Sequence, residues 1–289
     1  MNWKLKLKAI LHDPPYKMLA FQGPSQLVQN IKLQKAPHIG YNLKSKDDPE
    51  HHYLHEIWAE ELLNYIFANE CIKDNNVELA DQLASAQSRI IVKPQLQNEQ
   101  DFNKDSQVNY NESYFIDIFS ERKEPIQTPD EVKVQDLFNR LGGLFPPSSD
   151  EEAKFIFLFL WRFYPEIFPQ INKHPADSRA PNHSIYDHLV QTSAIVLALP
   201  NPAFLLFTIG PVQSFISKAR KTSDLWSGSY MLSYLIWESM KILVEDEELG
   251  PDVIIFPNLF GQPLVDRWLY FEIFKNSPFA NFNEPRFKE

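Results

Sequence analysis

Two adjacent residues near the start of the chain, His12 and Asp13, carry side chains that ligate metal ions. An imidazole and a carboxylate from consecutive positions can reach one metal centre when the backbone is held at the last turn of a helix. Residues 3–11 can form that helix, and its apolar face would consist of Leu7, Ile10 and Leu11. Pro14 and Pro15 would end it, because proline lacks an N–H and disfavours the helical conformation of the residue before it.

Two further ligand candidates lie on predicted helices. Asp81 falls among small residues in a helix predicted over 77–92, and His188 lies on the apolar stripe of a helix predicted over 184–199. Each position also has a purely structural alternative. His12 and Asp13 could only mark a helix end with a favourable charge placement, Asp81 could be a solvated carboxylate, and His188 could be a hydrogen-bonded core histidine.

A histidine cluster opens a third predicted helix, over 50–69. His51 and His55 are four residues apart and share a face, with His52 between them. They are candidates for a second metal ion, with a surface cluster as the alternative. Imidazole and carboxylate donors without thiolate suit Mn, Fe, Ni or Zn. A pair of such ions can activate a bridging water and hold a phosphodiester for in-line attack, which makes phosphodiester hydrolysis the predicted chemistry.

Composition limits the class of protein. The 289 residues carry a formal net charge of −10, so the chain as a whole is not a general binder of polyanions. Cys71 is the single cysteine, which excludes an internal disulfide. The N-terminus has no signal-peptide apolar region, and the most apolar run, over 155–161, is too short to span a bilayer. We therefore expect a cytoplasmic protein that does not enter a membrane.

The sequence changes character at residues 200–202, which are rich in proline. Residues 1–200 are predicted to be mainly helical, with further helices over 130–141 and 151–168, loops over 18–50 and 94–114, and a short strand over 114–119. Residues 201–289 are predicted to begin an α/β sandwich, with strands over 203–209 and 253–256 and a long helix over 212–244, interrupted near 222–224. The expected class is α+β.

Five stretches carry a resemblance to a known family. They are LKAILHDPPYK (7–17), ELADQLASAQSR (78–89), PADSRAPNHSIYDHLVQTSA (175–194), TIGPVQSFISKARKTSDLWSGSYMLSYLIW (208–237) and PDVIIFPNLFGQPLVDRW (251–268). In these stretches the chain resembles the N-terminal part of the large, polymerase-like subunit of type III-B (Cmr) CRISPR interference complexes. The resemblance implies a circularly permuted HD phosphohydrolase-like domain over 1–200, followed by a first palm domain of ferredoxin-like topology over 201–289, which is truncated.

The permuted order assigns roles to the candidate ligands. The His–Asp pair of the family matches His12 and Asp13, and its later aspartate matches Asp81. The histidine that comes first in ordinary HD domains would come last here, at His188, with His183 as the fallback. The family implies cleavage of single-stranded DNA with transition-metal ions, catalysed at His12 and Asp13, while the complex holds crRNA and target RNA.

The palm part is implied to bind ATP only in a complete subunit, with Gly210, Gln213 and Ser214 as candidate contacts and a fold-building role as the alternative. The family's Gly-Gly-Asp-Asp turn and its zinc-binding cysteines are missing, so we expect no cyclic oligoadenylate synthesis from this chain alone. A basic cluster of Lys218, Arg220 and Lys221 could touch RNA, a partner subunit or only water.

Three functional hypotheses remain open from the sequence. The first is a metal-dependent nuclease acting on single-stranded DNA. The second is a non-catalytic scaffold that positions other Cmr subunits along crRNA and target RNA. The third is a phosphohydrolase of small nucleotides.

Overall fold

A computed structural model of the chain describes residues 3–14, 63, 67, 74–92, 114–117, 119–125, 146–177, 182–246 and 249–275. The chain divides between Val196 and Leu197 into two compact units, the first unit before this point and the second unit after it. Several predictions lie outside the described residues: the loop over 18–50, the helix over 130–141, most of the loop over 94–114, most of the helix over 50–69, and the histidines His51, His52 and His55.

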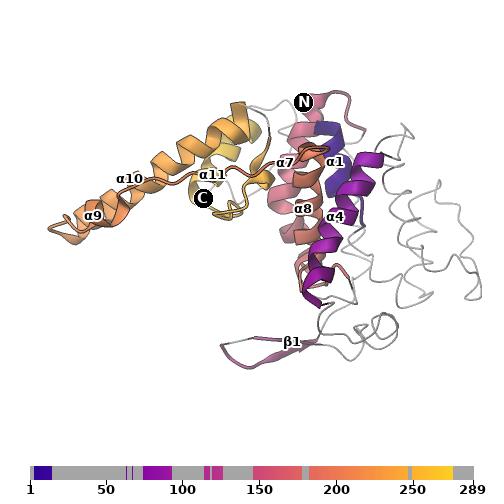
Figure 1. The fold of residues 1–289 in the computed structure, drawn as a ribbon, viewed down its shortest axis with the longest axis horizontal. Coiled ribbons are helices and arrows are strands. Elements are labelled where there is room, and N and C mark those ends of the chain that lie inside the picture. The colour runs from indigo at the N-terminus through magenta and orange to yellow at the C-terminus, as the bar shows by residue number, and fades with distance from the viewer. Residues whose placement is uncertain are drawn as a thin grey trace, which may run out of the picture. The chain divides into compact units, whose positions relative to one another are not determined.

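The first unit is a bundle of helices (Figure 1). Its members are α1 (Trp3–Ile10), α4 (Asn75–Val92), α7 (Asp150–Ile167) and α8 (Ile185–Ala198). The sequence predicts all of these helices, and the structure confirms each to within about two residues at its ends. Helix α1 packs against α7 and against α4, so the segment that leads to His12 is held between two neighbours.

Helix α1 is short, and packing rather than propensity stabilises it. Trp3 and Leu7 are buried, and the Trp3 ring packs on the Phe157 ring of α7 at a centroid distance of 5.6 Å. Lys6 is also buried, with its Nζ 4.8 Å from the centre of the Phe157 ring. The backbone N–H of Lys4 donates to Asp150 Oδ1 at 3.2 Å, which satisfies one free amide at the start of the helix.

Helix α7 forms the centre of the first unit. It begins with a capping box, in which Glu152 N–H donates to Ser149 Oγ at 3.1 Å and the Glu152 carboxylate accepts from Ser148. Its side chains from 155 to 161 are all buried, as the sequence predicts for a helix that is apolar on every side. None of the helices in the described part of the chain combines the length and the apolar character needed to cross a bilayer.

A two-stranded antiparallel hairpin is the one sheet among the described residues. Strand β1 (Tyr114–Ile116) pairs with β2 (Lys123–Pro125), with Phe115 opposite Glu124. The strand predicted over 114–119 is therefore present but ends at Ile116, because Asp117 starts the turn: its carboxylate accepts from the backbone N–H groups of Phe119 and Ser120.

The second unit consists of helices. They are α9 (Val212–Ile216), α10 (Thr222–Lys241), which continues as the π-helix η5 (Ile242–Asp246), the 3₁₀ turn η6 (Pro251–Val253), and α11 (Pro263–Trp268), which continues as the π-helix η7 (Leu269–Phe274). Its core lies where α10 meets α11: Trp237 packs on Trp268 at 5.8 Å, and Trp268 Nε1 donates to Glu245 Oε2 at 3.1 Å. A break between two helices is present, as predicted, but it lies at 217–221, and residues 222–224 form the first turn of α10.

The two strands predicted in the second unit are wrong. Residues 203–209 have no regular secondary structure, and Phe204 and Leu206 are 89% and 88% exposed. Residues 251–253 form η6, and Phe256 is 90% exposed. A strand is stable only beside a hydrogen-bonded neighbour, and the described residues of this unit contain no strand. The expected α/β sheet of 201–289 is therefore not formed within the described residues.

Candidate metal centre

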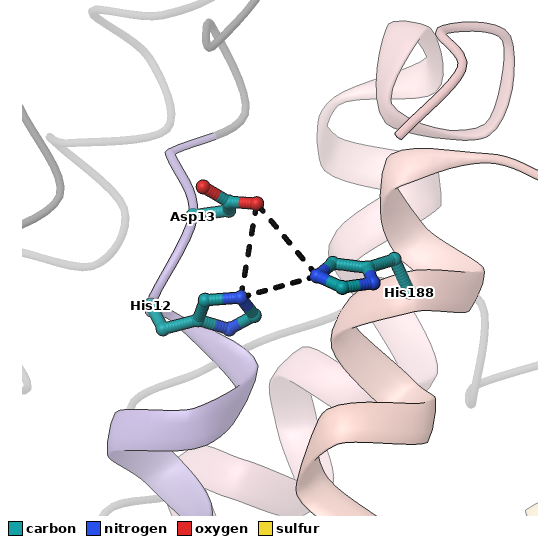
Figure 2. Close-up of side chains that lie close together, drawn as sticks. All are labelled: His12, Asp13 and His188. Atoms are coloured by element: carbon teal, nitrogen blue, oxygen red, sulfur yellow. Dashed lines mark hydrogen bonds and ion pairs between the residues drawn. The ribbon is translucent and has the colours of Figure 1, made fainter. Parts of the chain in front are cut away.

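Three of the predicted ligands converge in the first unit. His12 and Asp13 follow directly after α1, and His188 lies in the first turns of α8 (Figure 2). The two Nε2 atoms are 3.3 Å apart, and Asp13 Oδ2 is 3.7 Å from His12 Nε2 and 3.9 Å from His188 Nε2. One ligand atom from each residue thus lies within 4.8 Å of the others.

Asp81 of α4 contributes a second carboxylate to the same point. Its Oδ1 is 2.9 Å from His188 Nε2 and 3.6 Å from His12 Nε2. The Asp81 side chain is 39% exposed, whereas those of Asp13 and His188 are 7% and 3% exposed. The cluster is therefore buried on three sides and open to solvent beside Asp81. The structure brings together the four residues that the sequence placed far apart along the chain.

The spacing of the ligand atoms of His12, Asp13 and His188 fits one divalent ion. Nitrogen and oxygen ligands about 2.1 Å from a metal lie about 2.9 to 4.2 Å from one another in tetrahedral or octahedral geometry. The three separations among His12, Asp13 and His188 run from 3.3 to 3.9 Å. Asp81 approaches both imidazoles but is not in the group whose ligand atoms all lie within 4.8 Å of one another. Two imidazoles and two carboxylates without a thiolate are a donor set for Mn, Fe, Ni or Zn.

A backbone carbonyl fixes the orientation of the His12 ring. His12 Nδ1 donates to the Ala9 carbonyl at 2.6 Å, across the last turn of α1. Neutral histidine carries one N–H, so this bond leaves the Nε2 lone pair directed at the cluster. Ligating histidines in metalloproteins are held in this way, by a bond from the other ring nitrogen. Ala9 is a residue that sequence reasoning missed, since any side chain supplies the same carbonyl.

The charges of the cluster favour a cation at its centre. Burial disfavours the imidazolium of His12, but the carboxylates of Asp13 and Asp81 outweigh burial and raise the pKa of His12 above its ordinary value of 6.5. Burial alone would raise the pKa of Asp81, but its contacts with His12 and His188 hold that pKa well below its usual range. A proton on His12 would place a positive charge where a metal ion would lie, so proton and ion compete for this position.

The start of α8 is fixed by its neighbours in sequence. Asp187 N–H donates to Ser184 Oγ at 3.0 Å, and the Asp187 carboxylate accepts from the Ser184 hydroxyl at 2.8 Å, which forms a reciprocal cap. Ile185 N–H donates to the His174 carbonyl at 2.8 Å. These bonds set the first residue of α8, and hence the position of His188 one turn later.

The remaining predicted residues lie elsewhere. The His183 ring is 5.9 Å from the His188 ring, but His183 Nδ1 contacts Asn182 Oδ1 at 2.8 Å, and His183 is not in the group of three converging ligands. Gly210, Gln213 and Ser214 are exposed at the start of α9 in the second unit. The basic cluster Lys218, Arg220 and Lys221 is exposed between α9 and α10.

The first unit is thus a helical domain with a His/Asp site suited to a divalent metal. Comparison with known proteins shows which proteins this chain is similar to. The family model for the N-terminal region of the CRISPR-associated protein Cmr2 matches residues 204–285. The chain is 26% identical over 299 aligned residues to the CRISPR system Cmr subunit Cmr2 of Pyrococcus furiosus, and 29% identical over 270 to that of Saccharolobus solfataricus.

These alignments cover 91% and 88% of this chain but only 32% and 23% of the two relatives. The chain therefore spans about a third to a quarter of the length of the proteins that it matches. No solved structure matches it. The comparisons confirm the resemblance to the N-terminal part of the large subunit of type III-B CRISPR complexes.

Proposed function

We propose that the first unit is a permuted HD-type, metal-dependent nuclease that cuts single-stranded DNA. The observation that carries this proposal is the convergence of His12, Asp13, Asp81 and His188, which come from three separate segments of the chain. The expected metal is Mn, Ni, Fe or Zn, and ions of this kind, when bound, lower the pKa of a bound water and polarise a phosphoryl group.

The four residues would have different roles at this site. The two imidazoles and the buried Asp13 would hold the ion from the protein side. Asp81 lies at the open side of the cluster, where a phosphodiester and its attacking water would enter. Its carboxylate would also accept a hydrogen bond from that water and so orient it for attack.

In this proposal the chain acts inside a larger assembly. The similarity to Cmr2 subunits supports other Cmr subunits as partners. The nucleic-acid partners would be crRNA and target RNA, as the family resemblance implies. The second unit would correspond to the first palm domain, whose sheet needs strands from outside the described residues. Gly210, Gln213 and Ser214 would contact ATP only in a complete subunit, and this chain alone would make no cyclic oligoadenylate.

A direct test combines metal analysis with cleavage assays on the full chain. The wild type, His12→Ala/Asp13→Ala and the control His183→Asn are each loaded with Mn²⁺ or Ni²⁺ and given a single-stranded DNA oligonucleotide. We expect cleavage by the wild type and by the control, and a loss of at least about a hundredfold in the double variant. Equal cleavage by all three proteins would exclude this site. A parallel assay with free nucleotides would show whether small nucleotides are the better substrates.

A non-catalytic scaffold is the second candidate. It is favoured by one observation: the family model matches residues 204–285, in the second unit, and not the unit with the metal centre. A scaffold would bind partner subunits equally well with and without His12→Ala/Asp13→Ala, and the wild type would cut no DNA.

A further inference from the structure

We infer that Tyr186 is a positioning residue that sets the rotation of α8, and thereby aims His188 at the candidate metal centre. This inference depends on the metal site proposed above, but its observations are separate. They concern a hydrogen bond from Tyr186 to α7, on the side of α8 away from the cluster, and a missing hydrogen bond on the His188 ring.

The hydrogen bond begins with a proline in α7. Pro165 has no N–H, so the carbonyl of Trp161, four residues earlier, does not receive the usual helical bond. The Tyr186 hydroxyl donates to this carbonyl. Trp161 and Tyr186 are 3% and 6% exposed, so water has little access to either group. The Tyr186 hydroxyl therefore supplies a donor in place of the backbone N–H that Pro165 lacks.

His188 needs an external constraint more than His12 does. Both imidazoles direct Nε2 at the cluster, but only the His12 ring is fixed through Nδ1, by Ala9. His188 Nδ1 is buried and has no hydrogen-bond partner among the described residues. The ring orientation of His188 is therefore set by the rotation of α8 and by the contacts of Nε2 with Asp81 at 2.9 Å and with His12 at 3.3 Å.

The geometry of a helix connects the two residues. Side chains two positions apart point about 200° apart around the axis, so Tyr186 and His188 lie on nearly opposite sides of α8. A rotation of α8 by about 10° would displace a group about 6 Å from the axis by about 1 Å. A displacement of 1 Å is large for a metal ligand, whose bond length varies by only about 0.2 Å. The bond from Tyr186 to the rigid centre of α7 resists that rotation.

Tyr186→Phe tests the inference, because it removes the hydroxyl and keeps the ring. The matched control is Tyr164→Phe, the same chemical change at a buried tyrosine of α7. The full chain is titrated with Co²⁺, whose visible absorption reports both affinity and ligand geometry. We expect Tyr186→Phe to weaken Co²⁺ binding about tenfold and to change the absorption bands, while Tyr164→Phe binds like the wild type.

A second readout needs no metal. Histidine ring ¹⁵N NMR of the metal-free chain should show shifted His188 signals in Tyr186→Phe and unshifted ones in Tyr164→Phe. Co²⁺ binding and His188 signals that are both unchanged in Tyr186→Phe would overturn the positioning role and leave the metal site intact. A wild type that binds no metal, with His188 signals that still shift in Tyr186→Phe, would support the positioning role and reject the proposed nuclease.

Discussion

The two units of this chain differ in how their apolar side chains are used. In the first unit, the apolar residues of α7 and α1 are buried against each other. In the second unit, the N-terminal half of α10 exposes Trp226 and Tyr230, which stack on each other at 5.8 Å, and Phe204 and Phe256 are almost fully exposed. A segment with helical periodicity forms the predicted helix when its apolar face packs on another helix of the same unit. A segment with strand-like composition does not form a strand when no neighbouring strand is present.

The largest expected effect is on the free energy of unfolding, and it should separate the two units sharply. Phe157→Ala removes a fully buried ring that packs on Trp3, and should cost about 3 to 5 kcal/mol in urea denaturation. Phe204→Ala, at an exposed position, should cost less than about 0.5 kcal/mol. Equal costs would show that Phe204 is buried in solution and that the contrast between the units is wrong.

Metal affinity should depend on pH through His12. Because the pKa of His12 is raised in the metal-free protein, its proton competes with the ion. Below that pKa the metal affinity should rise about tenfold per pH unit, because about one proton is released for each ion bound. Above that pKa the affinity should no longer change with pH. Calorimetric titration in buffers of different ionisation enthalpy measures the proton release, and a pH-independent affinity would place the ion elsewhere.

Stability of the metal-free protein should respond to pH in the opposite sense. A raised pKa means that His12 contributes stability fully below pH 6.5, and that this contribution is lost as the pH rises through the folded pKa. Hydrogen-exchange protection of α1, corrected for intrinsic rates, should therefore fall as the pH is raised from 6.5 through the folded pKa of His12. This pH-dependent loss of protection should be absent in His12→Asn. Protection of α11 in the second unit should not change over the same pH range.

The helix caps give a smaller difference between the units. Ser184 caps α8, so Ser184→Ala should cost about 1 kcal/mol. Lys221 occupies the N-cap of α10 without a side-chain cap bond, so Lys221→Ser should stabilise that helix, by about 0.5 kcal/mol. Thermal unfolding with a separate probe for each unit measures both. A stabilising Ser184→Ala or a destabilising Lys221→Ser would contradict the assigned caps.

Local patterns in the sequence predicted much of the first unit. The continuous apolar run inside α7 and the apolar spacing of α1, α4 and α8 predict their helices without tertiary information. Predicting that His12, Asp81 and His188 lie together required the family resemblance. Periodicity shows which residues share one face of a helix, but it does not show which helices pack against each other. The sequence does not predict the contact of His12 with the Ala9 carbonyl. The only sequence signal for the Tyr186–Trp161 bond is Pro165, which lacks the N–H that would otherwise bond to the Trp161 carbonyl.

The second unit shows where local reasoning fails. Residues 203–209 and 253–256 have the apolar, β-branched composition of buried strands. Residues of these types favour a strand because they pack well against neighbouring strands. The described residues supply no such neighbours, so the preference is not realised there. Helix α10 forms in spite of its exposed apolar residues, because its backbone hydrogen bonds are internal.

X-ray absorption spectroscopy of the metal-loaded full chain tests the central proposal most directly. With Zn²⁺ or Ni²⁺ bound, we expect nitrogen and oxygen ligands at about 2.0 to 2.2 Å, with the outer-ring scattering of two imidazoles. That imidazole signal should be halved in His188→Ala and unchanged in His183→Ala. A metal that does not bind, or one whose spectrum is the same in the wild type and His188→Ala, would contradict a metal centre formed by His12, Asp13, Asp81 and His188.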